Sequence, residues 1–311
     1  MEHLELRCKT CNFYNHFSIQ NLLGEDRVMN LYHYTSINTL LIILDKSEFR
    51  FSNRHFLNDE TEGKYVFQLC KRHIDEICPP ETSSDIKEKF KQKCDEMVDK
   101  MTDDPVAGFK IYQLSFSTCS DDLCMWNYYA QQTGCNLKFN KARLVDSFKS
   151  RLVDSNGNGK ILLYGKVTYD QQNQIKMLNT LVSTFFQHLK GADLQSFLFV
   201  LTQAILQLGI FFKHPAFSVE HEYRVAYDLF NKDIAIKDLQ DKPYEMNIYS
   251  KQNMLVPYID VAFCPSDLEK ITLAPTANAK LLIPGIQIAV QSKFGHIEKN
   301  NIDVSEIPIR F

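Results

Sequence analysis

"LYHYTS", residues 31–36, and "SVEHEYRVAY", residues 218–227, decide the fold and the function that we predict for this chain. Both stretches have the aromatic and aliphatic content of buried β-strands. The first nevertheless carries a histidine, and the second carries two glutamates and an arginine. A strand that only fills a core seldom contains such groups. We therefore expect the two strands to meet around a ligand, with His33 at one end and a glutamate at the other.

The composition is that of an ordinary globular protein. The chain has 311 residues, of which 44% are hydrophobic, and this is enough for one large domain or two modest ones. The formal net charge of -3 argues against a broad nucleic-acid surface, which would show a basic excess. The N-terminus has no basic segment followed by an apolar run, so we expect no signal peptide and a cytoplasmic location.

One apolar run, residues 197–212, needs to be distinguished from a membrane span. It is shorter than the roughly 20 apolar residues that a bilayer requires, and Gln203 and Gln207 interrupt it. Because a primary amide is costly to bury in lipid, the run predicts a buried helix, and we expect no membrane partner.

The cysteines indicate reduced thiols. There are nine, an odd number at scattered positions, and no secretion signal accompanies them. Cys8 and Cys11 form one C-x-x-C pair, with His16 nearby, but a structural zinc site needs four ligands. Since the sequence has no second pair, we expect no metal.

The order of predicted elements favours an α+β fold over a doubly wound sheet, because strands and helical blocks do not alternate regularly. Strands are predicted at residues 31–35, 48–52, 111–118, 135–139, 161–169, 222–227, 258–263, 270–275 and 285–290. Helices are predicted after residue 36, from 58–63 onward, and at 86–101, 122–131, 171–190 and 192–212. We expect an extension over residues 1–30 and one domain over 31–311, with helical insertions near 80–101 and 171–212.

Several common catalytic motifs are absent. The sequence contains no G-x-G-x-x-G, G-x-x-x-x-G-K-[ST], G-x-S-x-G or H-E-x-x-H. This argues against a Rossmann dehydrogenase, a P-loop NTPase, a common serine hydrolase and a zincin.

His33 is open to two interpretations. In a strand, Tyr32 and Tyr34 face one way and His33 the other. His33 is either a core histidine bonded to backbone or a ligand-holding group beside an aromatic surface, and periodicity favours the core interpretation.

Two other groups also have alternative roles. Ser115 and Ser117, at the end of a strand, either line a pocket or cap the next helix. The aromatic run of Trp126, Tyr128 and Tyr129 either fills the core, which burial favours, or forms a stacking wall for a flat ring.

The stretch "EHEYRV" places Glu220, Glu222 and Arg224 on one face of a strand, with His221 and Tyr223 on the other. One interpretation is a solvent-facing strand with an ion pair. The other is a carboxylate that Arg224 holds and aims at a ligand hydroxyl or a developing cation.

Read in order, these segments resemble the bacterial domain of unknown function 2971 family, from about Leu31 to the C-terminus. The resemblance is carried by "LYHYTS", "FRFSN…FLNDETE", "SFS", "MWNYYA", "FKHPAFSVEHEYRV", "PYIDVAF", "KITLAP" and "IPIRF". Two features depart from the family pattern: the helical block at residues 80–101 and Glu60, where the family typically has proline.

The family has no settled activity, but its opening strand and helix are similar to those of ADP-ribosyltransferase-like folds. These include bacterial toxins that modify DNA and the RNA 2′-phosphotransferases. The resemblance implies a mixed or antiparallel split sheet. It also implies that His33 holds the adenosine-side ribose of NAD, that Ser117 with Tyr34 or Tyr128 lies along the nicotinamide, and that Glu220 or Glu222 binds the nicotinamide ribose.

The resemblance thus implies an NAD-dependent ADP-ribosyltransferase in bacterial defence or a toxin–antitoxin pair, with a protein, a nucleic acid or water as acceptor. The alternatives are a non-catalytic nucleotide- or partner-binding module and a thiol hydrolase using Cys119 or Cys124 with His33. The candidate catalytic residues are Glu222, Glu220 and His33. The candidate substrate-binding residues are Tyr32, Tyr34, Thr35, Asn58, Ser115, Ser117, Trp126, Tyr128, Tyr129 and Arg224.

Overall fold

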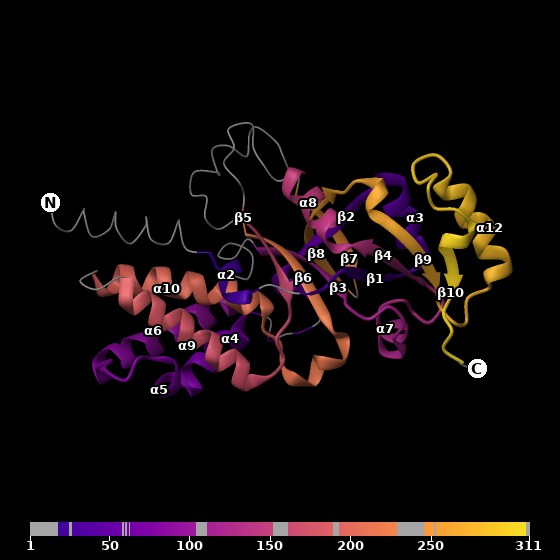
Figure 1. The fold of residues 1–311 in the computed structure, drawn as a ribbon. Helices are drawn as coiled ribbons and strands as arrows, with labels where there is room; N and C mark the ends of the chain where they lie inside the picture. The colour runs from indigo at the N-terminus through magenta and orange to yellow at the C-terminus, as the bar shows by residue number, and fades with distance from the viewer. Residues whose placement is uncertain are drawn as a thin grey trace. The chain divides into compact units, whose positions relative to one another are not determined.

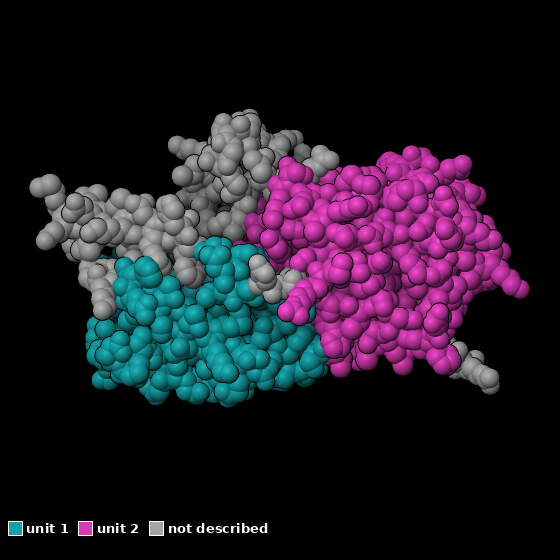
Figure 2. All heavy atoms as spheres, in the orientation of Figure 1, with its two compact units in different colours: residues 1–26, 54–111, 165–218 teal, residues 27–53, 112–164, 219–311 magenta. Residues whose placement is uncertain are grey.

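The fold is known from a computed structural model, which contains two compact units, shown in teal and magenta in Figure 2. The structure describes residues 18–308, apart from 25–26, 58, 60, 62, 104–110, 152–160, 189–192, 229–245 and 252. Unit 1 comprises residues 1–26, 54–111 and 165–218, and unit 2 comprises 27–53, 112–164 and 219–311. The predicted α+β class is confirmed, because a mixed sheet and many helices are both present.

Unit 2 contains most of a ten-stranded sheet (Figure 1). The main path of the sheet runs in the order β10-β9-β4-β1-β3-β2-β8-β7. These strands are β10 (Ile302–Val304), β9 (Leu268–Leu273), β4 (Cys135–Asn140), β1 (Asn30–Thr35), β3 (Ile111–Ser117), β2 (Glu48–Asn53), β8 (Met254–Ala262) and β7 (Met246–Lys251). Off this path, β6 (Glu222–Asp228) pairs with β3 and with β5 (Ile161–Lys166).

Strand β3 has three neighbours, although a strand has only two hydrogen-bonding edges. Near its start, Tyr112 and Gln113 lie opposite β2, and at its end Ser117 lies opposite Tyr32 of β1. Two of the three neighbours must therefore share one edge of β3 at different points along it. β1 therefore meets β3 at the C-terminal end of β3, where Tyr32 lies opposite Ser117. The start of β6 lies at the same end, since Thr118 N donates to the carbonyl of His221.

One face of the sheet carries the main core of unit 2. Three helices cover it with buried side chains: α3 (Ile37–Lys46), α8 (Lys141–Arg151) and α12 (Ala279–Val290). Phenylalanine rings fill the space beneath them, and Phe49 contacts Phe116, Phe139 and Phe263 at centroid distances of 5.6, 5.4 and 5.0 Å. Ser36 caps α3 by accepting from Thr39 N, as is common for a serine at this position.

A smaller cluster contains the short helix α7 (Leu123–Tyr128). Met125 and Trp126 of α7 pack against Tyr34 of β1 and Ala274. Gly134, directly before β4, must be a glycine, because a Cβ there would lie 2.1 Å from the Thr35 carbonyl oxygen. This close approach holds the loop after α7 against the end of β1.

Unit 1 is a group of packed helices. They are α4 (Lys64–Arg72), α5 (Ile74–Ile77), α6 (Ser84–Asp103), α9 (Gln171–His188) and α10 (Leu194–Leu208). Both predicted helical insertions contribute to this unit. Arg54 is 1% exposed and donates to the carbonyls of Leu206 and Gly209 at 3.2 and 2.7 Å, at the C-terminal end of α10.

The apolar segment Leu194–Phe211 is long and apolar enough to cross a membrane, but 78% of it is buried inside the protein. The predicted buried helix is therefore confirmed as α10, in which Gln203 and Gln207 are themselves buried.

Most predicted strands are confirmed, but the strand predicted at residues 285–290 is wrong, since these residues belong to α12. Ile286, Ile288 and Val290 would share one face of a strand. Instead Ile286 and Val290, four residues apart, are buried, while Ile288 is 75% exposed, as a helix requires. The candidate zinc ligands Cys8, Cys11 and His16 lie outside the described residues.

Candidate functional site

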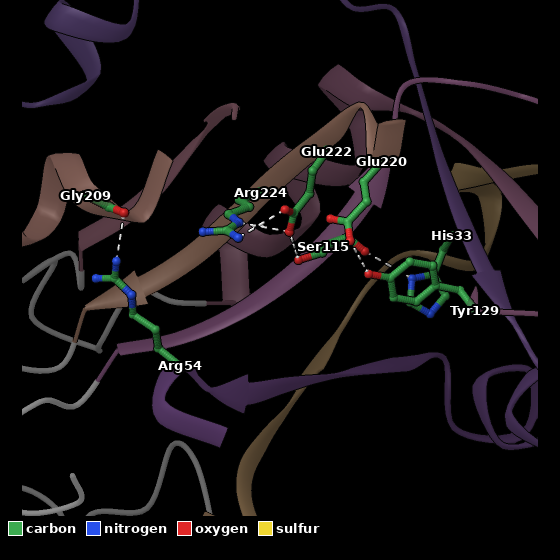
Figure 3. Close-up of polar contacts among 8 residues, drawn as sticks. All are labelled: His33, Arg54, Ser115, Tyr129, Gly209, Glu220, Glu222 and Arg224. Atoms are coloured by element: carbon green, nitrogen blue, oxygen red, sulfur yellow. Dashed lines mark hydrogen bonds and ion pairs between the residues drawn. The ribbon is translucent and has the colours of Figure 1, made fainter. Parts of the chain in front are cut away.

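A buried ion pair on β6 forms the centre of the candidate site. Arg224 Nε lies 2.9 Å from Glu222 Oε1, and Arg224 Nη2 lies 3.0 Å from Glu222 Oε2 (Figure 3). Arg224 is 1% exposed and Glu222 is 6% exposed. The predicted pairing is thus present, but the solvent-facing interpretation of this strand is wrong. A two-pronged guanidinium contact favours the ionised carboxylate and fixes its orientation.

Ser115 joins this pair to β1. Its hydroxyl donates a short hydrogen bond to Glu222 Oε1, and its carbonyl accepts from Nδ1 of His33 at 3.4 Å. β1 and β6 do not lie side by side, because β3 is paired with both of them, so His33 meets the glutamate strand only through Ser115 of β3.

His33 is a neutral imidazole in this position. Its ring packs edge-on against Phe49 and Phe116, at centroid distances of 5.0 and 5.7 Å. Burial lowers its pKa to about 4, against a weaker opposing effect of the Ser115 hydrogen bond. Because a carbonyl only accepts, Nδ1 carries the proton, and Nε2, which no described residue hydrogen-bonds, is an acceptor.

Glu220 does not lie on the strand as predicted. It ends the 3-10 helix Pro215–Glu220, and β6 begins only at Glu222. Between them His221 has a φ of 46°, which breaks the alternation of a regular strand. Glu220 nevertheless turns toward the site, where Tyr129 donates to its Oε1 at 2.8 Å (Figure 3). Burial and the Glu220 carboxylate raise the pKa of Tyr129 above its ordinary range.

These groups surround a hollow of about 60 Å³. Eight of the predicted site residues line it: Tyr32, His33, Tyr34, Ser115, Ser117, Tyr129, Glu220 and Glu222. The site residues come from β1, β3, β6, the end of the 3-10 helix before β6 and the segment at the end of α7, and all of them belong to unit 2. Phe116 and Met125 also line the hollow. Sequence reasoning missed both, because an apolar residue in a strand or helix carries no sign that it borders a cavity.

The remaining predicted residues lie elsewhere. Trp126 is fully buried, and its indole nitrogen donates to Asp121 at 2.5 Å, so it belongs to the core. Tyr128 is 76% exposed and does not line the hollow. Thr35 is buried at the end of β1, also away from the hollow. Arg224 does not line the hollow but contacts Glu222, which does, and Asn58 lies outside the described residues.

The two tyrosines of β1 face away from His33, as predicted. Both pack with the α7 cluster, whereas His33 packs with the phenylalanine core. The Tyr34 hydroxyl donates to the carbonyl of Cys119 at 3.0 Å and accepts from Asp122 N, so it fixes the loop before α7. Burial raises the pKa of the Cys119 thiol, which disfavours the thiolate that a cysteine hydrolase needs.

The comparisons with known proteins concern part of the chain. Residues 125–225 match a family model described as a protein of unknown function (DUF2971), which agrees with the predicted resemblance over about a third of the chain. The matched segment includes Tyr129, Glu220 and Glu222. No curated protein and no solved structure matches the chain.

Proposed function

We propose that unit 2 binds NAD and cleaves its nicotinamide–ribose bond, transferring ADP-ribose to a macromolecule or to water. The observation that carries this proposal is the carboxylate of Glu222, which Arg224 and Ser115 hold at the wall of a hollow shared with His33. The ADP-ribosyltransferase-like resemblance supplies the substrate, because it places a histidine, a serine or aromatic residue and a glutamate around NAD.

In this reaction the carboxylate stabilises the positive charge that develops on the ribose. As the glycosidic bond breaks, its electron pair goes to the nicotinamide nitrogen, which becomes neutral, and positive charge develops on the ribose. A fixed carboxylate stabilises that charge more in the transition state than in the ground state. The acceptor then bonds to the ribose carbon and loses its proton to a base. Removing such a preorganised group typically costs about 10²–10³ in rate.

His33 and Arg224 have supporting roles in this proposal. His33 is neutral and offers Nε2 as an acceptor, which suits a ribose hydroxyl. Arg224 is a positioning residue, since it keeps Glu222 ionised and oriented and is itself withdrawn from the hollow.

The hollow must widen before a ribose can bind. Its volume of about 60 Å³ admits a few water molecules, whereas small-molecule pockets are typically about 300–1,000 Å³. The hydrogen bond between Tyr129 and Glu220 joins the α7 segment to the segment before β6. We expect this bond to open when the substrate binds.

The same feature favours a second candidate, a nucleotide- or partner-binding module without turnover. Both oxygens of Glu222 already accept hydrogen bonds from protein groups. In this alternative the ion pair is structural, and the hollow only recognises a ligand. Bacterial defence or toxin–antitoxin activity remains a prediction in either case.

The test is incubation of NAD with the full chain and a cell lysate, with nicotinamide release and label transfer as readouts. We expect Glu222→Gln to lower release about 10²–10³-fold, and Glu220→Gln to lower transfer more than release. The exposed Glu88 of α6 gives a matched control, and Glu88→Gln should match the parent. Ser115→Ala keeps the ion pair and should reduce release less than Glu222→Gln.

Two results separate the alternatives. Background release by the parent, with NAD still bound and circular dichroism unchanged, would favour the binding module. If the parent neither releases nicotinamide nor binds NAD, both candidates are wrong.

A further inference from the structure

A second hollow, of about 70 Å³, borders His33 from another part of unit 2. Its walls come from α3, β2, β3 and β8, and His33 is the residue that it shares with the first hollow. Apolar side chains such as Ile43 and Phe49 form one part of the lining. Four charged side chains also line it: Lys46, Glu48, Arg50 and Asp260.

Arg50 is the unusual member of this set. Its guanidinium carbon lies 4.9 Å from the ring centre of Tyr258 and 5.5 Å from that of Tyr249. Apart from these rings, the guanidinium makes no hydrogen bond or ion pair with any residue that the structure describes. Two aromatic contacts thus hold a cation at the edge of a hollow while its N–H donors remain available.

An available guanidinium held in one orientation is a receptor for an oxyanion. Arginine matches phosphate geometry with two parallel hydrogen bonds, and stacking on aromatic rings reduces the conformational freedom lost on binding. Lys46 adds a second cation, since its ion pair with Asp260 is loose at 3.8 Å. The two cations together suit a phosphate group.

The carboxylates of Glu48 and Asp260 determine which phosphate compound fits. Asp260 lies directly opposite Arg50 in the β2–β8 ladder, so it is adjacent to any anion that Arg50 binds. A bare inorganic anion would be repelled by both carboxylates. A ligand that also presents sugar hydroxyls would instead donate hydrogen bonds to them.

We propose that this second hollow is a nucleotide-binding site, in which Arg50 and Lys46 hold a phosphate and Asp260 and Glu48 accept from ribose hydroxyls. Like the first hollow, it must widen before a ribose can enter, since its volume is about 70 Å³. The site stands independently of NAD cleavage, because it depends on none of the residues Ser115, Glu222 and Arg224. Its contact with His33 would let a bound nucleotide influence the first hollow.

The test is calorimetric titration of the full chain with adenosine monophosphate and, separately, with inorganic pyrophosphate. Neither probe contains a nicotinamide–ribose bond. The titration therefore tests the second hollow even if the protein does not cleave NAD. We expect adenosine monophosphate to bind more tightly than pyrophosphate. Arg50→Gln should weaken adenosine monophosphate binding about 10- to 100-fold, the usual effect of losing hydrogen bonds to a charged group.

Three variants make the result specific. Arg50→Lys keeps the charge and loses the paired geometry, so its binding should fall between that of the parent and that of Arg50→Gln. Arg143→Gln changes charge equally at an exposed position of α8 and should bind like the parent. Asp260→Asn should weaken adenosine monophosphate binding and strengthen pyrophosphate binding.

The proposal is overturned if neither probe binds at millimolar concentration, or if Arg50→Gln and Arg143→Gln bind adenosine monophosphate equally. It is also overturned if Asp260→Asn shifts both probes in the same direction.

Discussion

Two arginines, one in each unit, are both 1% exposed, yet they are satisfied in different ways (Figure 3). In unit 1, Arg54 donates to backbone carbonyls of Leu206 and Gly209, where the helix α10 ends. In unit 2, Arg224 makes a two-pronged contact with the carboxylate of Glu222.

The type of acceptor distinguishes an arginine with a structural role from an arginine that supports a functional site. Carbonyls at the C-terminal end of a helix lack intrahelical partners and carry partial negative charge, so a cation there stabilises the end of the helix. The backbone carbonyls that accept from Arg54 are not catalytic groups. A cation paired with a carboxylate leaves a fixed negative charge in the protein, and Glu222 presents that charge at a hollow. Burial of an arginine therefore says little about function until its acceptor is known.

The largest expected effect comes from breaking the pair in unit 2. Arg224→Met leaves the Glu222 carboxylate buried without its cation, which should cost about 3–5 kcal/mol of unfolding free energy. Replacing both partners, in the double variant Arg224→Met with Glu222→Met, should recover much of the lost unfolding free energy. The attraction between two buried charges roughly offsets the cost of removing them from water, so an apolar pair is about as stable. Urea unfolding of the parent and the two variants measures the difference. A double variant no more stable than Arg224→Met would contradict this account of the pair.

Breaking the contact in unit 1 should cost less. Arg54→Met leaves two carbonyls at the end of α10 without this donor, at about 1–3 kcal/mol in total. Hydrogen exchange should show faster opening confined to the last turn of α10. Faster exchange in β6 instead of α10 would contradict the assignment.

A drop in pH should test the surroundings of both arginines through one histidine in each unit. Burial lowers the pKa of His33, and that of His55 beside Arg54, to about 4. Below pH 6.5 the unfolded chain therefore binds protons that the folded chain does not. The unfolding free energy should be greatest above about pH 6.5 and decline between pH 6.5 and 4, by about 2 kcal/mol for each partly exposed ring.

Single variants assign the pH effect. His33→Gln and His55→Gln should each reduce the slope of unfolding free energy against pH, and the two reductions should add, because the residues belong to different units. An unchanged slope in either variant would show that the corresponding ring is already protonated or exposed.

Much of the fold follows from local pattern, and the errors of prediction have physical causes. Alternation in "LYHYTS" and "IYQLSFST" predicts β1 and β3, since a period of two is typical of strands. The same pattern in "GIQIAV" fits a helix equally well, and only the buried partners of Ile286 and Val290 decide between them. Short apolar runs do not identify their own neighbours.

The candidate site was predictable in its residue types but not in its geometry. The sequence predicts the pairing of Glu222 with Arg224 from their spacing, and the structure has it. It does not predict the left-handed backbone of His221, which moves Glu220 off the strand and toward Tyr129. The separation of Tyr129 from Tyr128 is also hidden, because adjacent residues of a short helix point in different directions.

The interleaving of the two units bears on how the polypeptide is made. Each unit is assembled from three separate segments of sequence, so neither unit is complete until segments far apart in the sequence have left the ribosome. Strand β1 is synthesised early, but its neighbour β4 also needs β9, and β3 needs β6, both of which come much later. The nascent chain must therefore keep an unfinished sheet from aggregating until more than 270 residues have emerged. Ribosome-bound chains halted shortly before β9 should accordingly depend on chaperones in a way that completed chains do not.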